Sequence, residues 1–580
     1  MTTSTSETPP AGCSHRSSLT DRFGVGAAFV LSSVRMRRTP PQSRAPGRAA
    51  AALLGAVVGL STAAGAAPPA RGIPRLVTAD GRTRLEVDGR PFLILGGELA
   101  NSSAGSLGAA KAALGRLKGL GLNTVLVPVS WELVEPAEGK LDFALVGDVI
   151  REARRDHLHL VLLWFGSWKN GMSSYVPGWV KRDEKRFPRA EAAGGRGVEA
   201  LSAFSETNRA ADARAFAALM RYLRSVDASA HTVLMVQVEN EVGMIGEASD
   251  GSRAASEALT RQVNDDLAPA GAPADGHAGT QGADAPKVRI LVAGNGPATE
   301  ERFQAWHFAR YVDAVARAGK AEYPLPMFAN AALNAPGLAP GKYPSAGPLP
   351  HLFDVWKAGA PTLDFLAPDI YFPGFAVWSE RYRRPDNPLF IPEAKNGEEV
   401  AVNVLYAAGQ QALGVSPFAI DAISAGAGAG LTRSYQLLAE LAPTLLAAAP
   451  GRTAGVLVDK DAPTTTVTMG GFKLTVSHDY TFPWASPARN DPTWPRGGGL
   501  VIALADDEYL VAGNGIIVTF APATPGAPLV GLERVDEGRF KNGRFVATRR
   551  LNGDETHQGR QVRLPMGDLG LQRVKIYRYH

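Results

Sequence analysis

Short apolar runs alternate with amphipathic segments from about residue 90 to residue 425. The runs are almost continuously apolar, which is typical of parallel strands buried on both faces. Between them apolar residues recur at helical spacing, as in Phe216, Leu219, Met220 and Leu223. Eight such strands with intervening helices predict a (β/α)8 TIM barrel. The predicted strands are Phe92–Leu99, Thr124–Trp131, His159–Ser167, Val233–Glu241, Pro326–Ala332, Asp364–Phe372, Pro388–Glu393 and Leu413–Ile420.

The pattern changes near residue 450. A Leu-rich helical segment covers about 425–449 and ends at Pro450-Gly451. Beyond it, short strand-like runs alternate with Gly, Asn and Asp turns, which predicts an all-β domain. We therefore expect a catalytic barrel over 67–450 and a β-sandwich-like domain over 451–580. Residues 269–286, rich in Ala, Gly, Asp and Pro, are expected to form a long excursion after the fourth strand.

The first 66 residues have the composition of a leader. Basic residues from Met36-Arg37-Arg38 to Arg48 precede an apolar run, Ala49–Leu60, and Ala64-Gly65-Ala66 matches a signal-peptidase site. The run is too short to span a membrane. These features predict export to the periplasm or the extracellular space, with Met36 as an alternative start.

Charge and cysteine content exclude several classes of function. Seven arginines and two acidic residues in the leader account for the whole formal net charge of +5, so the rest of the chain is neutral. That balance argues against a nucleic-acid partner. Cys13 is the only cysteine and lies in the leader, and the ten histidines show no metal-ligand spacing. Cysteine nucleophiles and thiolate metal sites are therefore excluded. The oligomeric state is left open.

Acidic and aromatic side chains gather where the predicted strands end. Glu241 follows Val236-Gln237-Val238 and, 152 residues later, Glu393 follows Phe390-Ile391-Pro392. Strand ends face the active site of a barrel. Two carboxyls there suit glycoside hydrolysis, in which one acid protonates the leaving oxygen and the other stays ionised. Further candidates at strand ends are Glu98, Trp131, Trp168, Asn170, Asn240 and Tyr371.

The segment Glu239-Asn240-Glu241 offers two acids for the proton-donor role. Strict alternation along a strand would send Asn240 to the opposite face from both acids. Asn240 and Glu241 can reach one pocket only if the strand end kinks. We favour Glu241 and keep Glu239 as its competitor.

Several stretches make the chain resemble glycoside hydrolase family 35 β-galactosidases, in the bacterial subgroup with a small C-terminal β-domain. The resemblance covers nearly everything after residue 75. It rests on VDGRPFLILGGEL (87–99), GLNTVLVPVSWELVEPAEGKLDF (121–143), VQVENEVG (236–243), PDIYF (368–372), PLFIPEA (388–394) and, toward the C-terminus, LNGDETHQGRQVRLP (551–565).

This resemblance implies a retaining double displacement on terminal β-D-galactose of oligosaccharides or plant cell-wall polysaccharide fragments. Glu241 becomes the acid/base, Glu393 the nucleophile, and Tyr371 the hydrogen-bond partner of the nucleophile. Glu98, Asn170 and Asn240 would hold sugar hydroxyls, and Trp131 and Trp168 would form the pocket wall. The two carboxyl groups are then expected about 5–5.5 Å apart. We expect neither a metal nor an organic cofactor, because carboxylates alone can perform both steps of glycoside hydrolysis.

Two alternatives remain open. The same apparatus serves a β-xylosidase or an α-L-arabinopyranosidase, and a carbohydrate-binding protein on an inactive scaffold would also keep the aromatic and amide side chains. Activity against aryl glycosides separates these possibilities.

Overall fold

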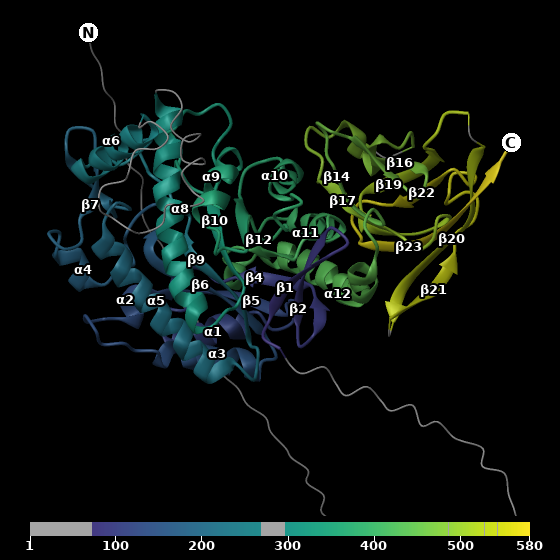
Figure 1. Ribbon diagram of the computed structural model, residues 1–580. Helices are drawn as coiled ribbons and strands as arrows, with labels where there is room; N and C mark the ends of the chain where they lie inside the picture. The colour runs from purple at the N-terminus through teal and green to yellow at the C-terminus, as the bar shows by residue number, and fades with distance from the viewer. Residues whose placement is uncertain (1–71, 268–295, 485–486, 527, 542) are drawn as a thin grey trace, which may run out of the picture. The chain divides into compact units, whose positions relative to one another are not determined.

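The computed structural model describes residues 72–267 and 296–580, apart from 485–486, 527 and 542 (Figure 1). These residues belong to one compact unit, Pro68–His580. The predicted leader over 1–66 and the predicted excursion over 269–286 lie outside the described residues. Export therefore stays a prediction. The domain boundary at 450/451 also stays a prediction, because the described residues on both sides of it belong to one compact unit.

Eight parallel strands close into a barrel in chain order, which confirms the predicted fold class. Each strand lies within three residues of its predicted limits. They are β4 (Ile94–Glu98), β5 (Thr124–Ser130), β6 (His159–Lys169), β9 (Val233–Asn240), β10 (Met327–Ala332), β11 (Phe365–Ile370), β12 (Ile391–Ala394) and β13 (Gly414–Pro417).

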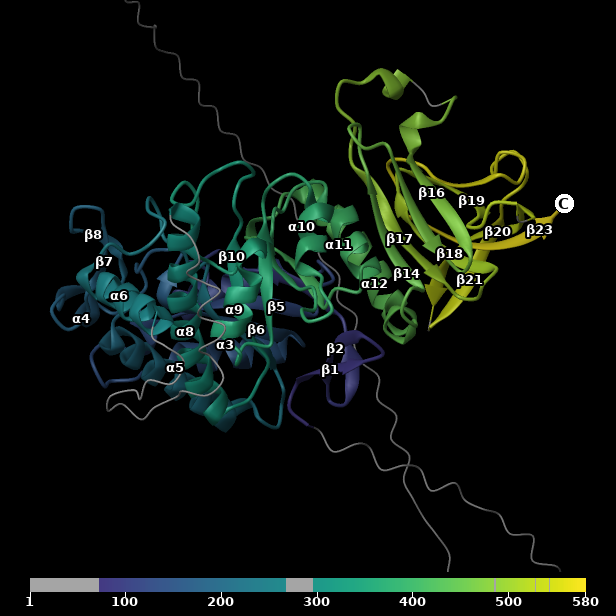
Figure 2. The ribbon, with the colours of Figure 1, turned by 45° about the horizontal axis from the view of Figure 1, so that its top comes forward.

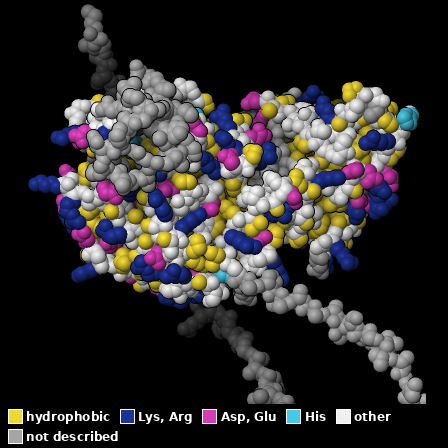
Figure 3. Space-filling model, in the orientation of Figure 1, with side chains coloured by type: hydrophobic (Ala, Val, Ile, Leu, Met, Phe, Trp, Pro, Cys, Tyr) yellow, Lys and Arg dark blue, Asp and Glu magenta, His cyan; other side chains and the backbone are white. Residues whose placement is uncertain are grey.

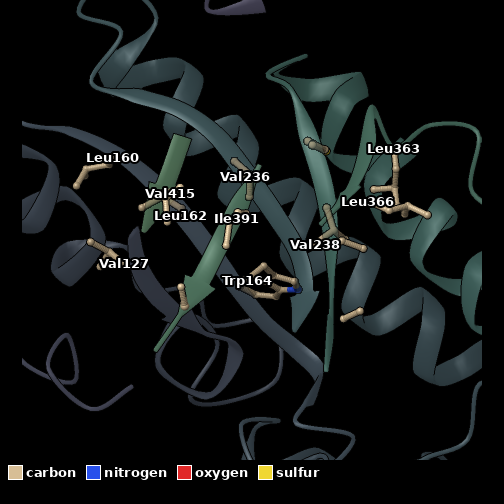
Figure 4. Close-up of a cluster of buried hydrophobic side chains, with 14 of the residues drawn as sticks. Val127, Leu160, Leu162, Trp164, Val236, Val238, Leu363, Leu366, Ile391 and Val415 are labelled. Atoms are coloured by element: carbon tan, nitrogen blue, oxygen red, sulfur yellow. The ribbon is translucent and has the colours of Figure 1, made fainter. Parts of the chain in front are cut away.

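Side chains along β6 alternate between two cores. Leu160, Leu162 and Trp164 belong to the layer between strands and helices (Figure 4), whereas Val161 and Leu163 belong to the interior of the barrel. Because both faces are buried, the strand needs apolar residues at every position. This explains why its sequence reads as a continuous apolar run.

Helices follow the strands around the barrel, and Figure 1 shows α5 and α8 side by side. Their apolar residues recur at i, i+3, i+4 and i+7, which directs one stripe of each helix at the strands. The longer helices are α1 (Leu107–Arg116), α3 (Ala144–Arg155), α5 (Glu206–Asp227), α6 (Arg253–Leu267), α8 (Pro297–Glu322), α11 (Val400–Gly409) and α12 (Ala425–Ala447); the shorter ones are α2 (Trp131–Val134), α4 (Gly178–Arg182), α9 (Phe353–Gly359) and α10 (Phe375–Tyr382).

An antiparallel sheet of β1 (Arg75–Ala79), β2 (Arg82–Val87) and β3 (Arg90–Phe92) precedes the barrel. Leu85 and Val87 pack with the apolar side chains of the barrel interior. The sheet therefore closes off part of the interior core. A second small ribbon pairs β7 (Arg189–Ala192) with β8 (Arg196–Leu201).

Two antiparallel sheets form the C-terminal region (Figure 2), as the turn-rich sequence predicts. Side chains of both sheets, such as Val456, Leu474, Val518 and Val574, share one core. One sheet has the order β14 (Thr453–Val458), β17 (Gly497–Ala503), β18 (Glu508–Asn514), β23 (Gly570–Tyr579), β20 (Leu529–Lys541) and β21 (Arg544–Arg550); the other has β15 (Thr464–Met469), β16 (Phe472–His478), β19 (Ile516–Pro522) and β22 (Gln561–Leu564).

Helix α11 of the barrel packs against the first of these sheets. A Cβ on Gly409 would come 2.6 Å from the backbone of Ala454, so the helix and β14 approach closely only because glycine stands there. Gln411 Nε2 also donates to Thr453 Oγ1 at 3.1 Å.

The surface charges and the apolar character of the helices are relevant to nucleic-acid and membrane partners. Side chains of both charge signs are interspersed over the face shown in Figure 3. Of the helices within the described residues, none has both the length and the apolar character that crossing a bilayer requires.

Candidate active site at the carboxyl end of the barrel

Five barrel strands bring ionisable side chains to one place. Glu98 ends β4, Lys169 ends β6, Glu241 follows β9, Asp369 lies in β11 and Glu393 lies in β12. All five are at most 5% exposed. One carboxyl oxygen each of Glu241, Asp369 and Glu393 lies within 4.8 Å of the others. The two acids singled out from the sequence therefore meet, and we call these five residues the carboxylate cluster.

Glu393 is held by donors on both oxygens. The Tyr371 hydroxyl donates to Oε2 at 2.8 Å, and Asn240 Nδ2 donates to Oε1 at 3.3 Å. Lys169 Nζ lies 4.0 Å from Oε1. Two hydrogen bonds and an ammonium therefore fix the position of the Glu393 carboxyl. Burial and the charge of Glu393 raise the pKa of Tyr371 well above its ordinary value, so the phenol stays a donor.

Glu241 is held by an amide on each side. Its backbone N–H donates to Asn330 Oδ1 at 3.0 Å, and Asn170 Nδ2 donates to its Oε2. Asn330 in turn donates to Asp369 Oδ2 at 2.6 Å. Burial, reinforced by the charge of Glu393, raises the pKa of Glu241 to about 7. A carboxyl with that pKa still carries a proton near neutral pH, as a general acid must.

The end of β9 is kinked. The sequence required such a kink if Asn240 and Glu241 were to reach the same place. Glu239 and Glu241 have φ angles of 63° and 45°, in the left-handed region that side chains other than glycine seldom adopt. Strain of this kind persists where the surroundings impose it, and it is common at functional sites. The kink lets both Asn240 and Glu241 approach Glu393.

The Glu239 side chain points away from the cluster instead. Its Oε2 accepts a hydrogen bond from the Trp168 backbone N–H at 2.7 Å, in a space that exists because Gly166 has no side chain. Burial and the nearby carboxylate of Asp212 on α5 raise its pKa well above the ordinary value. Glu239 therefore lies between the barrel wall and α5, and only Glu241 of the two faces Glu393.

Glu98 and Asp369 are the cluster's least satisfied acids. Both oxygens of Glu98 and Oδ1 of Asp369 are buried without a hydrogen-bond partner among the described residues. Burial and the charge of Glu393 raise the pKa of both carboxyls well above their ordinary values. Buried polar atoms are nearly always paired, so these exceptions indicate a place where a polar ligand binds.

Trp131 and Trp168 lie elsewhere, contrary to their predicted place in the pocket wall. Both are 0% exposed. Trp131 donates its indole N–H to Glu135 at 2.9 Å, and Trp168 packs edge-on against Phe308 and Tyr311 of α8. The strand places Trp168 on the face toward the helices, like Trp164. The buried rings of Trp131 and Trp168 therefore offer no surface to a ligand.

Three residues of the site were missed from the sequence, namely Lys169, Asn330 and Asp369. Asp369 is two positions before Tyr371 and so shares its strand face, which was a usable signal. Lys169 directly precedes Asn170 at a strand end. Asn330 lies in the middle of an apolar run and gave no signal of its own.

The cluster could also be considered as a cation site, because carboxylate oxygens are the ligands of Ca²⁺ and Mg²⁺. Lys169 already supplies a positive charge beside Glu393, and Asn330 occupies Asp369 Oδ2. An ammonium and an amide thus already contact the carboxyl oxygens that a divalent ion would need as ligands. The expected lack of a metal stays a prediction.

Comparison with known proteins adds little to this geometry. A protein-family profile described as a domain of unknown function (DUF5597) matches residues 431–563, less than a quarter of the chain. No curated protein matches.

Solved structures with a detectable likeness include three β-galactosidases. The Rahnella sp. R3 enzyme is 15% identical over 61% of this chain and 57% of its own (TM-score 0.44), and the Bacillus circulans sp. alkalophilus enzyme is 15% identical over 61% and 57% (TM-score 0.43). A catalytic mutant of Gan42B, a GH42 β-galactosidase from G. stearothermophilus, is 14% identical over 62% and 58% (TM-score 0.44). The chain thus spans less than two thirds of these proteins, and likenesses this weak carry no argument about activity.

Proposed function

We propose that this chain is a retaining β-glycosidase that removes terminal β-D-galactose from oligosaccharides or cell-wall polysaccharide fragments. One observation carries the proposal: oxygens of Glu241 and Glu393 lie within 4.8 Å of each other in a buried cluster. Retaining enzymes separate their two carboxyls by about 5–5.5 Å, whereas inverting enzymes need about 6.5–9.5 Å to admit a water molecule.

The first step uses the two acids in opposite protonation states. A carboxylate oxygen of Glu393 attacks the anomeric carbon while Glu241 gives its proton to the departing glycosidic oxygen. The C–O bond to the leaving group breaks and a covalent glycosyl–enzyme ester forms. The Tyr371 hydroxyl and the Lys169 ammonium hold the Glu393 carboxyl in place for the attack.

The second step reverses the roles. Glu241, now ionised, takes a proton from a water molecule, whose oxygen attacks the anomeric carbon and releases Glu393. The sugar leaves with its original configuration. No other proton carrier is required, because the same carboxyl gives one proton to the leaving group and then takes one from water.

Galactose as the sugar rests on the family 35 resemblance. The groups available to bind hydroxyls are the unpaired carboxyl oxygens of Glu98 and Asp369, the amide oxygen of Asn240, and Asn170 beside the acid. Asn240 donates to Glu393 and so lies where a 2-hydroxyl would approach the nucleophile. Hydrogen bonds to that hydroxyl strengthen at the transition state.

The test compares aryl β-galactoside, β-xyloside and α-L-arabinopyranoside, with the anomer of the first product followed by NMR. We expect the galactoside to be preferred and the β-anomer to appear first. Equal or better turnover of a pentoside would replace galactose, and an α-anomer would make the enzyme inverting. A protein that binds galactosides without hydrolysing any of them would be a carbohydrate-binding protein.

Azide distinguishes the roles of the two acids. With an aryl galactoside whose leaving group needs no protonation, azide should rescue Glu241→Gln and give the β-galactosyl azide. With Glu393→Gly it should give the α-azide, because azide then replaces the nucleophile. Glu239→Gln is the matched control, since Glu239 lies two residues away and outside the cluster; it should retain activity.

A further inference from the structure

Large apolar side chains are exposed in segments that directly follow residues of the carboxylate cluster. Tyr371 and Phe372, just after β11, are 42% and 38% exposed, and they follow the strand that carries Asp369. Met172 and Ile245 are 38% and 49% exposed, and they follow Asn170 and Glu241 by two and four residues. Exposed apolar side chains that follow the residues of a polar site can receive the apolar face of a ligand bound there.

The segments that carry Met172 and Ile245 are packed on each other. Lys169 and Met172 exchange backbone hydrogen bonds at 2.8 and 3.0 Å, which closes a tight turn through Asn170 and Gly171. A Cβ on Gly171 would come 2.7 Å from the Gly243 carbonyl oxygen and 3.1 Å from the Ile245 side chain. Glycine therefore lets the turn rest directly on the chain that follows Glu241.

The same turn positions the acid. Asn170, with φ of 53°, donates its side-chain N–H to Glu241 Oε2. Ile245 lies against the next residue of that turn, and Met172 closes it. Both apolar side chains therefore belong to the two segments that hold Glu241, namely the turn that carries Asn170 and the chain that follows the acid.

In a retaining glycosidase the acid stands beside the bond to the leaving group. We propose that Met172 and Ile245 form the leaving-group subsite and receive the apolar face of the departing group, either the C–H face of a sugar ring or an aromatic ring. This inference rests on the proposed glycosidase function. The substrate class is accordingly a galactoside whose aglycone presents an apolar face, rather than a small polar alcohol.

The test uses the double variant Met172→Ser/Ile245→Ser and two galactosides. For an oligosaccharide whose galactose is attached to another sugar ring, we expect kcat/KM to fall about tenfold or more, the range expected for lost apolar contacts in a pocket. For 2,4-dinitrophenyl β-galactoside, kcat is expected within twofold of wild type. Its leaving group departs without a proton, and the slow step is then hydrolysis of the glycosyl–enzyme, in which Glu241 is the base.

This second measurement separates leaving-group contact from damage to the acid. If the substitutions merely displaced Glu241, hydrolysis of the glycosyl–enzyme would slow as well, and equal losses on both substrates would overturn the inference. No loss on either substrate would also overturn it. Val226→Ser is the matched control, because Val226 is 37% exposed on α5 just before its C-terminus, remote in the sequence from both segments.

Transfer to an added sugar acceptor gives an independent readout. An acceptor occupies the leaving-group subsite when it replaces water in the second step. The double variant should therefore form less transfer product relative to galactose. If the wild type hydrolyses no galactoside, the proposed function is wrong. If the wild type is active and the double variant behaves like it, only the subsite proposal is wrong.

Discussion

The carboxylate cluster of the barrel and the buried acids of the C-terminal sheets differ in how their charges are balanced. In the cluster, four carboxyl groups face one ammonium, that of Lys169. In the C-terminal region, Asp479, which directly follows β16, accepts from Arg563 at 2.6 Å and from the Met566 N–H at 3.2 Å. Asp536 pairs with both Arg534 and Arg550.

The difference indicates what each region is built for. An acid with a dedicated arginine and backbone donors behaves as a structural element, because its charge is compensated in the folded state. Acids that share one ammonium acquire displaced pKa values, and such displacement is concentrated at catalytic sites. If this contrast is correct, substitutions in the cluster should cost activity, and substitutions in the sheets should cost stability.

Glu393→Gln should produce the largest effect. Loss of the nucleophile removes the covalent intermediate, so kcat/KM on an aryl galactoside should fall by about four to six orders of magnitude. The thermal midpoint should not decrease, because the substitution removes one negative charge from an overcrowded cluster. A variant that loses its fold together with its activity would contradict the contrast.

Lys169→Met should have the next largest effect, a fall in kcat/KM of about 10²-fold. Burial lowers the pKa of Lys169, but the charges of Glu393, Glu241 and Glu98 outweigh it and raise that pKa. The ammonium in turn lowers the pKa of Glu241, so its removal should move the alkaline limb of the pH–rate profile above the wild-type position near pH 7. A profile that keeps its alkaline limb would show that Lys169 does not act on the acid.

The barrel could be predicted from the sequence because its strands are buried on both faces. Strands that pack on one side only were harder to recognise. The strand β21 has mostly exposed residues, from Arg544 to Arg550, and no apolar run marks it. The hairpin between β1 and β2 was also missed, although Asp80-Gly81, with φ of 52° and 71°, is a sequence typical of tight hairpin turns.

At the site, strand ends located the acids but could not reveal which way each side chain turns. Glu239 and Glu241 obey the same alternation and separate only through the kink at their left-handed residues. Trp168 precedes Lys169 and Asn170, yet packing against α8 removes it from the pocket. These outcomes depend on contacts between distant segments, which local sequence patterns do not contain.

Asp479→Asn tests the other side of the contrast. The substitution keeps the shape of the side chain but removes the charge that pairs with Arg563. We expect a loss of about 1–2 kcal/mol in the free energy of unfolding, a modest value because the Arg563 side chain is partly exposed and solvent screens the pair. Activity measured well below the thermal midpoint should be unchanged. A fall in kcat/KM at such temperatures would tie the sheets to catalysis.

Among the substitutions in the cluster, Asp369→Asn should have the smallest effect on catalysis, because burial and the charges of Glu393 and Glu241 raise the pKa of Asp369 and favour its protonated form. The Asn amide oxygen can still accept the hydrogen bond from Asn330, and its N–H₂ replaces the acid proton as a donor, so kcat/KM should stay within about threefold of wild type. Asp369→Ala, which removes both contacts, is the contrasting variant and should be clearly slower.

Stability against pH gives the second readout for Asp369→Asn. A carboxyl whose pKa is raised by folding stabilises the folded state fully below its unfolded pKa of about 3.9, and this contribution is lost as the pH rises toward the folded value. Asparagine does not titrate, so the variant should lose less stability than wild type between pH 4 and pH 8, as thermal midpoints across that range would show. Equal pH dependence in both proteins would mean that Asp369 is ionised in the folded state. The cluster would then hold one more negative charge than a neutral Asp369 allows, and Lys169 would have to balance that charge as well.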